Sequence, residues 1–176
     1  MHTLIVGAPG VGKSTLISRL ARELGAPLFG FETKKEDSLS DPRLGSPIYI
    51  YEAGQERRRG EENLVGYCLN QKPAPRKEAF DRFAAKLRAP VPTGAVVVLD
   101  ELGIMEARSE EFCAAVLALL DGDAPVIAAV KHKDTPFLKR VRSHPNCRCF
   151  HITVENREQM YDRALAFAKE QLSGAR

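Results

Sequence analysis

Short apolar runs recur along the chain, separated by longer polar or amphipathic segments. Runs of about five to eight apolar residues bounded by polar or turn-forming residues are typical of strands, because they are too short for buried helices. We predict strands at residues 3–7, 26–31, 95–101, 124–130 and 147–154. The run at 95–101 is the most apolar and ends in two acids, so it is predicted to be fully buried.

Between these runs, apolar residues recur at spacings of three and four. Leu16, Ile17, Leu20 and Leu24 share one helical face, and Gly25 ends that helix. Ser109 is a candidate N-cap and Pro136 a candidate first helical residue. We predict helices at residues 13–24, 75–89, 109–122, 136–142 and 155–172. Alternating strands and helices predict a mainly parallel sheet covered by helices on both faces.

The stretch from residue 47 to 69 departs from this alternation. Two apolar runs flank a polar turn at residues 54–62, which predicts an antiparallel β-hairpin. Residues 34–47 are polar and rich in turn formers, so we expect an exposed loop there. With no internal repeat and no linker composition, residues 1–176 are expected to form a single α/β domain.

Composition limits the classes of function. The chain is 44% hydrophobic and 28% charged, as in ordinary soluble proteins, and its net charge of +3 gives no argument for nucleic acid. No apolar run is long enough to cross a membrane, and the first ten residues lack signal-peptide features. We therefore expect a cytoplasmic protein with no membrane association, whose four cysteines are reduced thiols.

The most specific motif follows the first predicted strand. The stretch "GAPGVGKS" matches the phosphate-loop pattern, with a strand before it and an amphipathic helix after it. Glycines let the backbone curl around a phosphate with its N–H groups inward, and the helix N-terminus adds positive potential. The predicted nucleotide-binding residues are Gly7, Ala8, Pro9, Gly10, Val11, Gly12, Lys13, Ser14 and Thr15. In this arrangement Lys13 reaches the β- and γ-phosphates, Ser14 binds Mg²⁺ and Thr15 lies next to the α-phosphate.

Two carboxylates end the buried strand "AVVVLDELG". Ligands of α/β sheets bind at the carboxyl ends of strands, so Asp100 is predicted to hold Mg²⁺ through water. Glu101 is then placed to orient or deprotonate a water for attack on the γ-phosphate. Lys13 and Glu101 are the predicted catalytic residues, and Ser14 and Asp100 the predicted metal ligands.

Several stretches together resemble a known family. They are "GAPGVGKST", "GFET", "LDELGIME", "TPFLKRVRSHP" and "ITVENREQM". They are similar, in the same order, to the small P-loop nucleoside-triphosphatases known from thermophiles and as cancer-related nucleoside-triphosphatases. The resemblance implies a RecA-like sheet and Mg²⁺-dependent hydrolysis of several nucleoside triphosphates, such as ATP, GTP, CTP and UTP. It also implies the same roles for Gly7–Thr15, Asp100 and Glu101.

Two regions depart from the family pattern. After "GF" the family usually carries another aromatic residue and then acids, whereas this chain has Glu32, Lys34 and Lys35. Residues 38–92 match poorly. The preferred base and any partner surface are therefore left open.

Several basic residues are candidate phosphate ligands. Arg57, Arg58 and Arg59 are one possible source of an arginine finger, although flanking glutamates favour a solvated hairpin tip. Residues 131–133 follow a buried strand, so one of them is a candidate sensor of the γ-phosphate. Arg140 and Arg142 are candidates for phosphate or for the surface.

Other clusters carry weaker signals. His144, Cys147, Cys149 and His151 lie close in sequence, but their alternation is also that of a half-buried strand, so zinc is not predicted. Glu106 is a candidate contact for metal-bound water.

Two other functions remain open. One is a nucleoside or nucleotide kinase, with residues 32–46 and 75–89 forming an acceptor pocket and lid. The other is a slow nucleotide-dependent switch that acts on a protein partner. Nucleic-acid binding is not expected, because no aromatic stacking motif accompanies the basic residues, and the chain is expected to be a monomer.

Overall fold

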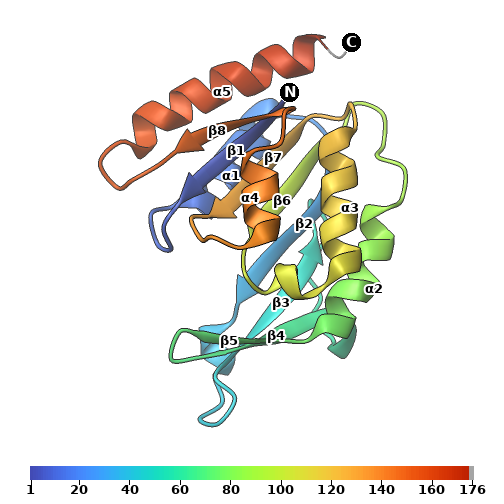
Figure 1. Ribbon diagram of the computed structural model, residues 1–176, viewed down its shortest axis with the longest axis vertical. Coiled ribbons are helices and arrows are strands. Elements are labelled where there is room, and N and C mark those ends of the chain that lie inside the picture. Colours follow the sequence, from blue (N-terminus) through green and yellow to red (C-terminus); the bar gives the residue numbers. More distant parts are fainter. Residues whose placement is uncertain (175–176) are drawn as a thin grey trace.

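A single eight-stranded sheet runs through the molecule (Figure 1). The computed structural model describes residues 1–174. The strands are β1 (His2–Gly7), β2 (Leu28–Lys35), β3 (Ser46–Glu52), β4 (Leu64–Leu69), β5 (Lys72–Pro75), β6 (Val96–Leu102), β7 (Val126–Lys131) and β8 (Cys147–His151). Their order across the sheet is β5-β4-β3-β2-β6-β7-β1-β8. Strands β2, β6, β7, β1 and β8 are parallel, and β3, β4 and β5 extend the sheet in antiparallel fashion.

Helices cover both faces of the parallel strands, as the alternating pattern predicts. They are α1 (Lys13–Leu24), α2 (Lys77–Leu87), α3 (Glu110–Asp121), α4 (Pro136–Arg142) and α5 (Arg157–Gly174). Helices α1 and α5 pack on one face, and α2, α3 and α4 pack on the other. The predicted fold class, a mainly parallel α/β sheet with an antiparallel hairpin, is confirmed.

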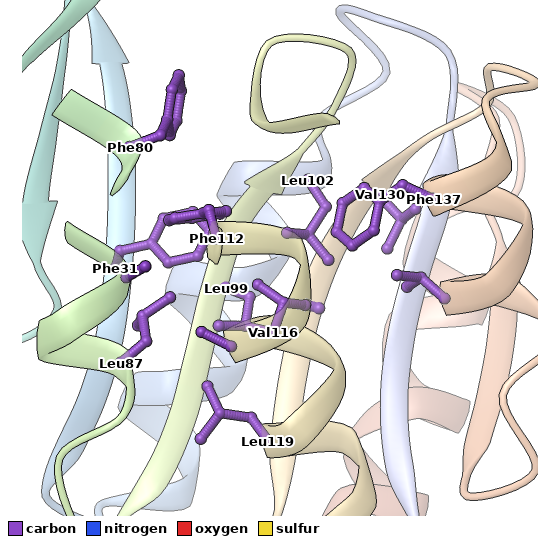
Figure 2. Close-up of a cluster of buried hydrophobic side chains, with 14 of the residues drawn as sticks. Phe31, Phe80, Leu87, Leu99, Leu102, Phe112, Val116, Leu119, Val130 and Phe137 are labelled. Carbon is purple, nitrogen blue, oxygen red and sulfur yellow. The ribbon is translucent and has the colours of Figure 1, made fainter. Parts of the chain in front are cut away.

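Aromatic rings join the antiparallel extension to the rest of the core. Phe112 of α3 lies 5.2 Å from Phe31 of β2 and 5.2 Å from Phe80 of α2, measured between ring centroids. All three are fully buried, and Figure 2 shows them beside the apolar side chains of β6 and α3. Burial of large aromatic rings is a major stabilising contribution, so this cluster fixes α2 and the extension against the parallel strands.

The ends predicted for two strands were wrong, and one strand was missed. Strand β2 continues to Lys35, into the predicted loop, because Lys34 and Lys35 pair with β3. Strand β8 ends at His151 instead of residue 154. Strand β5 was missed, because "KPAP" is typical of a loop. Prolines are tolerated at this position because β5 is an edge strand. A two-residue turn with positive φ at Asn70 and Gln71 connects it to β4.

Candidate active site

The phosphate-loop sequence forms a tight connection between β1 and α1. Gly10 and Gly12 have φ of 81° and 99°, in the left-handed region that favours glycine. Gly7 makes a close approach, since a Cβ there would lie 2.8 Å from the carbonyl oxygen of Ile152. The loop therefore passes against the segment that follows β8.

Lys13 is buried at the start of α1, although its side chain carries a charge. Its amine donates to the carbonyl oxygen of Ala8 at 2.8 Å and lies 3.0 Å from Oε2 of Glu101. A buried amine requires such partners. The loop and the end of β6 are thus joined by an ion pair between the two residues predicted to be catalytic.

Ser14 and Asp100 meet at the same place. The Ser14 hydroxyl donates to Oδ1 of Asp100 at 2.7 Å. Oδ2 of Asp100 is buried and has no hydrogen-bond partner among the residues that the structure describes; the Lys34 amine is 3.9 Å away. Burial raises the pKa of Asp100 to about 6, against the opposing effects of Ser14 and Lys34. Unpaired buried carboxylate oxygens are costly, so this oxygen has the properties of a cation ligand.

A register shift in β6 orients the two acids. The pairing of β6 with β7 is irregular between Asp100 and Leu102, which is the mark of a β-bulge. Bulges change the direction of a side chain beside active sites. Thr33 of β2 holds the same peptide: its hydroxyl is 3.3 Å from the Asp100 carbonyl oxygen and 3.3 Å from the Glu101 nitrogen.

Glu101 lies between two lysines. Its Oε1 is 3.0 Å from the amine of Lys131, the last residue of β7, while Oε2 faces Lys13. Burial lowers the pKa of Lys131, but the charge and hydrogen bond of Glu101 outweigh it and the pKa is raised. Of the three candidates at 131–133, it is Lys131 whose amine pairs with Glu101.

Glu106 is buried and lines the same cavity as Glu101 and Lys131. Its Oε2 accepts a hydrogen bond from the Gly103 backbone at 2.8 Å. Burial raises its pKa to about 7, although the Lys131 charge opposes this. Glu106 therefore supports the turn after β6.

A cavity of about 500 Å³ opens in front of the phosphate loop. Pro9, Gly10 and Ser14 line one end, next to Glu101. The other end is lined by β3, β4, β5 and α2, with an apolar wall that includes Ile48 and Val65. The antiparallel extension thus shapes the space beyond the phosphate loop.

Three of the other basic candidates have partners of their own. Arg57 pairs with Glu32, and Arg58 pairs with Glu56 at the hairpin tip. Arg142 donates to the carbonyl oxygens of Lys131 and Lys133 at 3.2 and 2.8 Å and so braces the loop after β7.

The possible zinc cluster is not formed. Within residues 1–174, the structure contains no group of three or more His, Cys, Asp or Glu side chains placed to hold a metal ion. Cys147 and Cys149 pack against the core, and His144 pairs with Asp121. Burial raises the pKa of Cys147 to about 12, so this thiol is an inert core residue.

Sequence patterns did not identify two residues beside the loop. Thr33 positions the Asp100–Glu101 peptide, and Arg157 lies over Gly12, where an added Cβ would be 3.4 Å from its Nη1. Thr33 and Arg157 lie in "GFET" and "TVENR", two of the stretches that carry the family resemblance. That resemblance was the only sign in the sequence that these residues belong to the site.

Comparison with known proteins places the chain in a family. Residues 2–165 match the NTPase family. The chain belongs to the NTPase family. Nucleoside-triphosphatase THEP1 of Aquifex aeolicus is 30% identical over 179 residues, covering 94% of this chain and 98% of that protein. The THEP1 protein of Thermococcus kodakarensis is 29% identical, covering 100% and 98%.

Solved structures of NTPase-family relatives share the fold. The crystal structure of THEP1 from Aquifex aeolicus superposes with a TM-score of 0.70 at 26% identity, covering 96% of this chain and 99% of that one. The solution structure of a human cancer-related nucleoside triphosphatase gives 0.67 at 24% identity, covering 96% and 97%. None of the helices described in the present chain has the length and hydrophobicity needed to cross a membrane.

Proposed function

We propose that the protein hydrolyses nucleoside 5′-triphosphates, including ATP, GTP, CTP and UTP, to diphosphate and phosphate with Mg²⁺ as cofactor. The observation that carries the proposal is the hydrogen bond between Ser14 and Asp100, with Oδ2 of Asp100 buried and unpaired beside it. This pair joins the phosphate loop to the strand end that holds Glu101.

The residues fit a magnesium site. A serine hydroxyl and a carboxylate, next to a loop that binds phosphate, form the oxygen-rich set that Mg²⁺ prefers. Ser14 and Asp100 would hold the ion, Asp100 through water. When bound, Mg²⁺ neutralises charge on the β- and γ-phosphates.

The loop would bind the triphosphate. Backbone N–H groups of the loop, except at Pro9, which has none, would bind the phosphates, and the N-terminus of α1 adds its dipole. The Lys13 amine would leave Glu101 and bind the β- and γ-phosphate oxygens, since it already lies at the loop.

Glu101 would act on the attacking water. The water oxygen forms a bond to the γ-phosphorus, the bond to the β–γ bridging oxygen breaks, and the diphosphate leaves. The proton of the water passes to Glu101. A positioned carboxylate base contributes about a hundredfold or more to such a step.

The test is phosphate release from each of the four triphosphates with Mg²⁺, without added acceptor or partner. Glu101→Gln should bind nucleotide normally and hydrolyse it at least about a hundredfold more slowly. Lys13→Ala should lose both binding and turnover. An unchanged rate for Glu101→Gln would remove this residue from the mechanism.

A second candidate function is phosphoryl transfer to a small acceptor. It is favoured by the lining of the cavity, which continues from the phosphate loop to Ile48 of β3, Val65 of β4 and Pro73 of β5. Diphosphate formed in excess of free phosphate when a hydroxyl compound is added would support it. Equal amounts of the two products would support hydrolysis.

A further inference from the structure

Lys131 occupies a fixed position between the two halves of the site. Strand β7 lies between β6 and β1, so its end is next to both the phosphate loop and the Asp100–Glu101 peptide. Lys131 pairs in register with Gly7, the first residue of the loop. Arg142 donates to its carbonyl oxygen, which fixes the backbone from which the side chain extends.

The side chain of Lys131 is also held along its length. A Cβ added to Gly103 would lie 3.0 Å from Cδ of Lys131 and 3.4 Å from its amine. The glycine therefore leaves room for the lysine beside the turn after β6. The side chain is 31% exposed, so its amine keeps access to the cavity.

The amine faces the side of Glu101 opposite to Lys13. Each carboxylate oxygen of Glu101 has one lysine at 3.0 Å. The two amines are therefore on either side of the group predicted to activate water. A position next to that group is also next to the γ-phosphate that the water attacks.

We propose that Lys131 is a catalytic residue that leaves Glu101 and binds the γ-phosphate of a triphosphate held in the loop. The inference rests on the proposed function and extends it with the cation that stabilises the transferring phosphoryl group. In other phosphoryl-transfer enzymes an arginine finger fills this role.

Charge favours the exchange. The transferring phosphoryl group spreads negative charge over three oxygens, and a γ-phosphate carries more charge than one carboxylate. The γ-phosphate would therefore compete with Glu101 for the amine. Transfer of Lys131 to the phosphate would leave Oε1 of Glu101 free for the water.

Other cations lie near the site, namely Lys34 at 3.9 Å from Asp100, Arg157 beside Gly12 and Lys133 on the cavity wall, but none of these three forms an ion pair with Glu101 among the described residues. Arg57 and Arg58 are paired with Glu32 and Glu56, and Lys35 with Asp37 at 3.0 Å. Lys131 is paired with the proposed base itself.

The first experiment compares Lys131→Ala with the wild type in binding and turnover. Affinity for MgADP should stay within about twofold, while affinity for the β,γ-imido analogue of MgATP should fall about tenfold. The value of kcat should fall about a thousandfold, the lower end of the range for loss of an arginine finger. Equal effects on both nucleotides, unchanged affinity for the analogue or a wild-type kcat would overturn the proposal.

Two further variants separate charge from structure. Lys131→Arg keeps the cation and should recover at least about a tenth of the wild-type kcat. Lys139→Ala, on the exposed side of α4, is the matched control and should leave kcat and both affinities unchanged. Failure of Lys131→Arg to exceed Lys131→Ala would contradict a role for the charge.

A third comparison tests whether Lys131 acts only by holding Glu101. In the Glu101→Gln background, Lys131→Ala should still weaken binding of the imido analogue, because the contact is to phosphate. Disappearance of the effect would make Lys131 a positioning residue and overturn the proposal.

The binding measurements also distinguish the two proposals. Absence of phosphate release from the wild type would contradict the proposed function. The difference between MgADP and the imido analogue would still report whether Lys131 contacts a γ-phosphate.

Discussion

At the scale of single residues, Glu106 is a buried acid to which the proposed mechanism assigns no role. It is 5% exposed, and its carboxylate accepts from the Gly103 backbone. Desolvation by burial raises its pKa from 4.5 to about 7. The folded protein therefore binds this proton more tightly than the unfolded chain does.

This shift predicts a pH dependence of stability. Protonation of Glu106 adds to the free energy of unfolding. This stabilisation is fully present below about pH 4.5 and is lost as pH rises through about 7. Glu106→Gln can still accept from Gly103 but has no charge to bury. Its free energy of unfolding relative to wild type should rise between pH 5 and pH 8 by up to about 3 kcal/mol. Urea unfolding at the two pH values measures this difference.

Exposed Glu23, changed to Gln, is the matched control for that series. If the free energies of unfolding of Glu106→Gln and wild type changed in parallel with pH, the buried carboxylate would have the same pKa in the folded and unfolded states.

The sequence could predict those site residues whose geometry is local. The phosphate-loop motif implies that Lys13 and Ser14 begin a helix beside the loop, and the acidic strand end implies that Asp100 meets it. The structure places the Ser14 hydroxyl 2.7 Å from Asp100 and the Lys13 amine 3.0 Å from Glu101, while the roles of these residues stay predictions. The pairing of Lys131 with Glu101 was not predictable, since it depends on which strand lies between β6 and β1. Nor was the burial of Glu106, because one acid among polar residues gives no sign of its depth.

At the scale of elements, α3 shows how one side chain can join two helices. Ser109 is buried at its N-cap, where its hydroxyl oxygen accepts from the Phe112 backbone at 3.0 Å. The same hydroxyl donates to Asp81 of α2. The N-cap prediction is confirmed, whereas the link to α2 needed the packing of the two helices.

Ser109→Ala removes both bonds. The lost cap alone costs about 1 kcal/mol, and an unsatisfied buried backbone N–H raises the expected loss of unfolding free energy to about 1–2 kcal/mol. Urea denaturation measures the loss. Ser18→Ala, at an exposed position of α1, is the control and should change stability by less than about 0.5 kcal/mol. Equal stabilities of the two variants would mean that the cap contributes nothing.

Local patterns predicted the helices better than the strands of the extension. The helices combine periodic apolar faces with start signals such as the N-cap Ser109 and the first helical residue Pro136, all readable along the chain. Strand β5 has no such signal, because its two prolines are compatible with it only as an edge strand. The extra length of β2 likewise comes from neighbours distant in sequence.

At the scale of the whole molecule, the phenylalanine cluster connects the antiparallel extension to the parallel sheet. Phe112 contacts rings from β2 and α2 and is fully buried. The cavity in front of the loop has walls on both sides of this connection. The shape of the cavity therefore depends on the packing of the phenylalanine cluster as well as on the phosphate loop.

Phe112→Ala should destabilise the protein by about 3–5 kcal/mol, because it removes ring contacts and leaves a cavity. Phe112→Leu should cost clearly less, since it keeps much of the apolar volume. Denaturant unfolding of both variants gives the comparison. A loss below about 1 kcal/mol for Phe112→Ala would show that the extension does not depend on this cluster.

The strand order has a consequence for how the protein is made. Strand β1 carries the phosphate loop, yet its sheet neighbours are β7 and β8, and His2 already bonds to a residue 124 positions further along the chain. At about 5–20 residues per second, a ribosome completes those neighbours on the order of ten seconds after β1. During that interval the nascent strand has no native partner on either edge. Nucleotide therefore cannot stabilise the earliest stages of folding, and the loop becomes able to bind it only after β7 and β8 have been made.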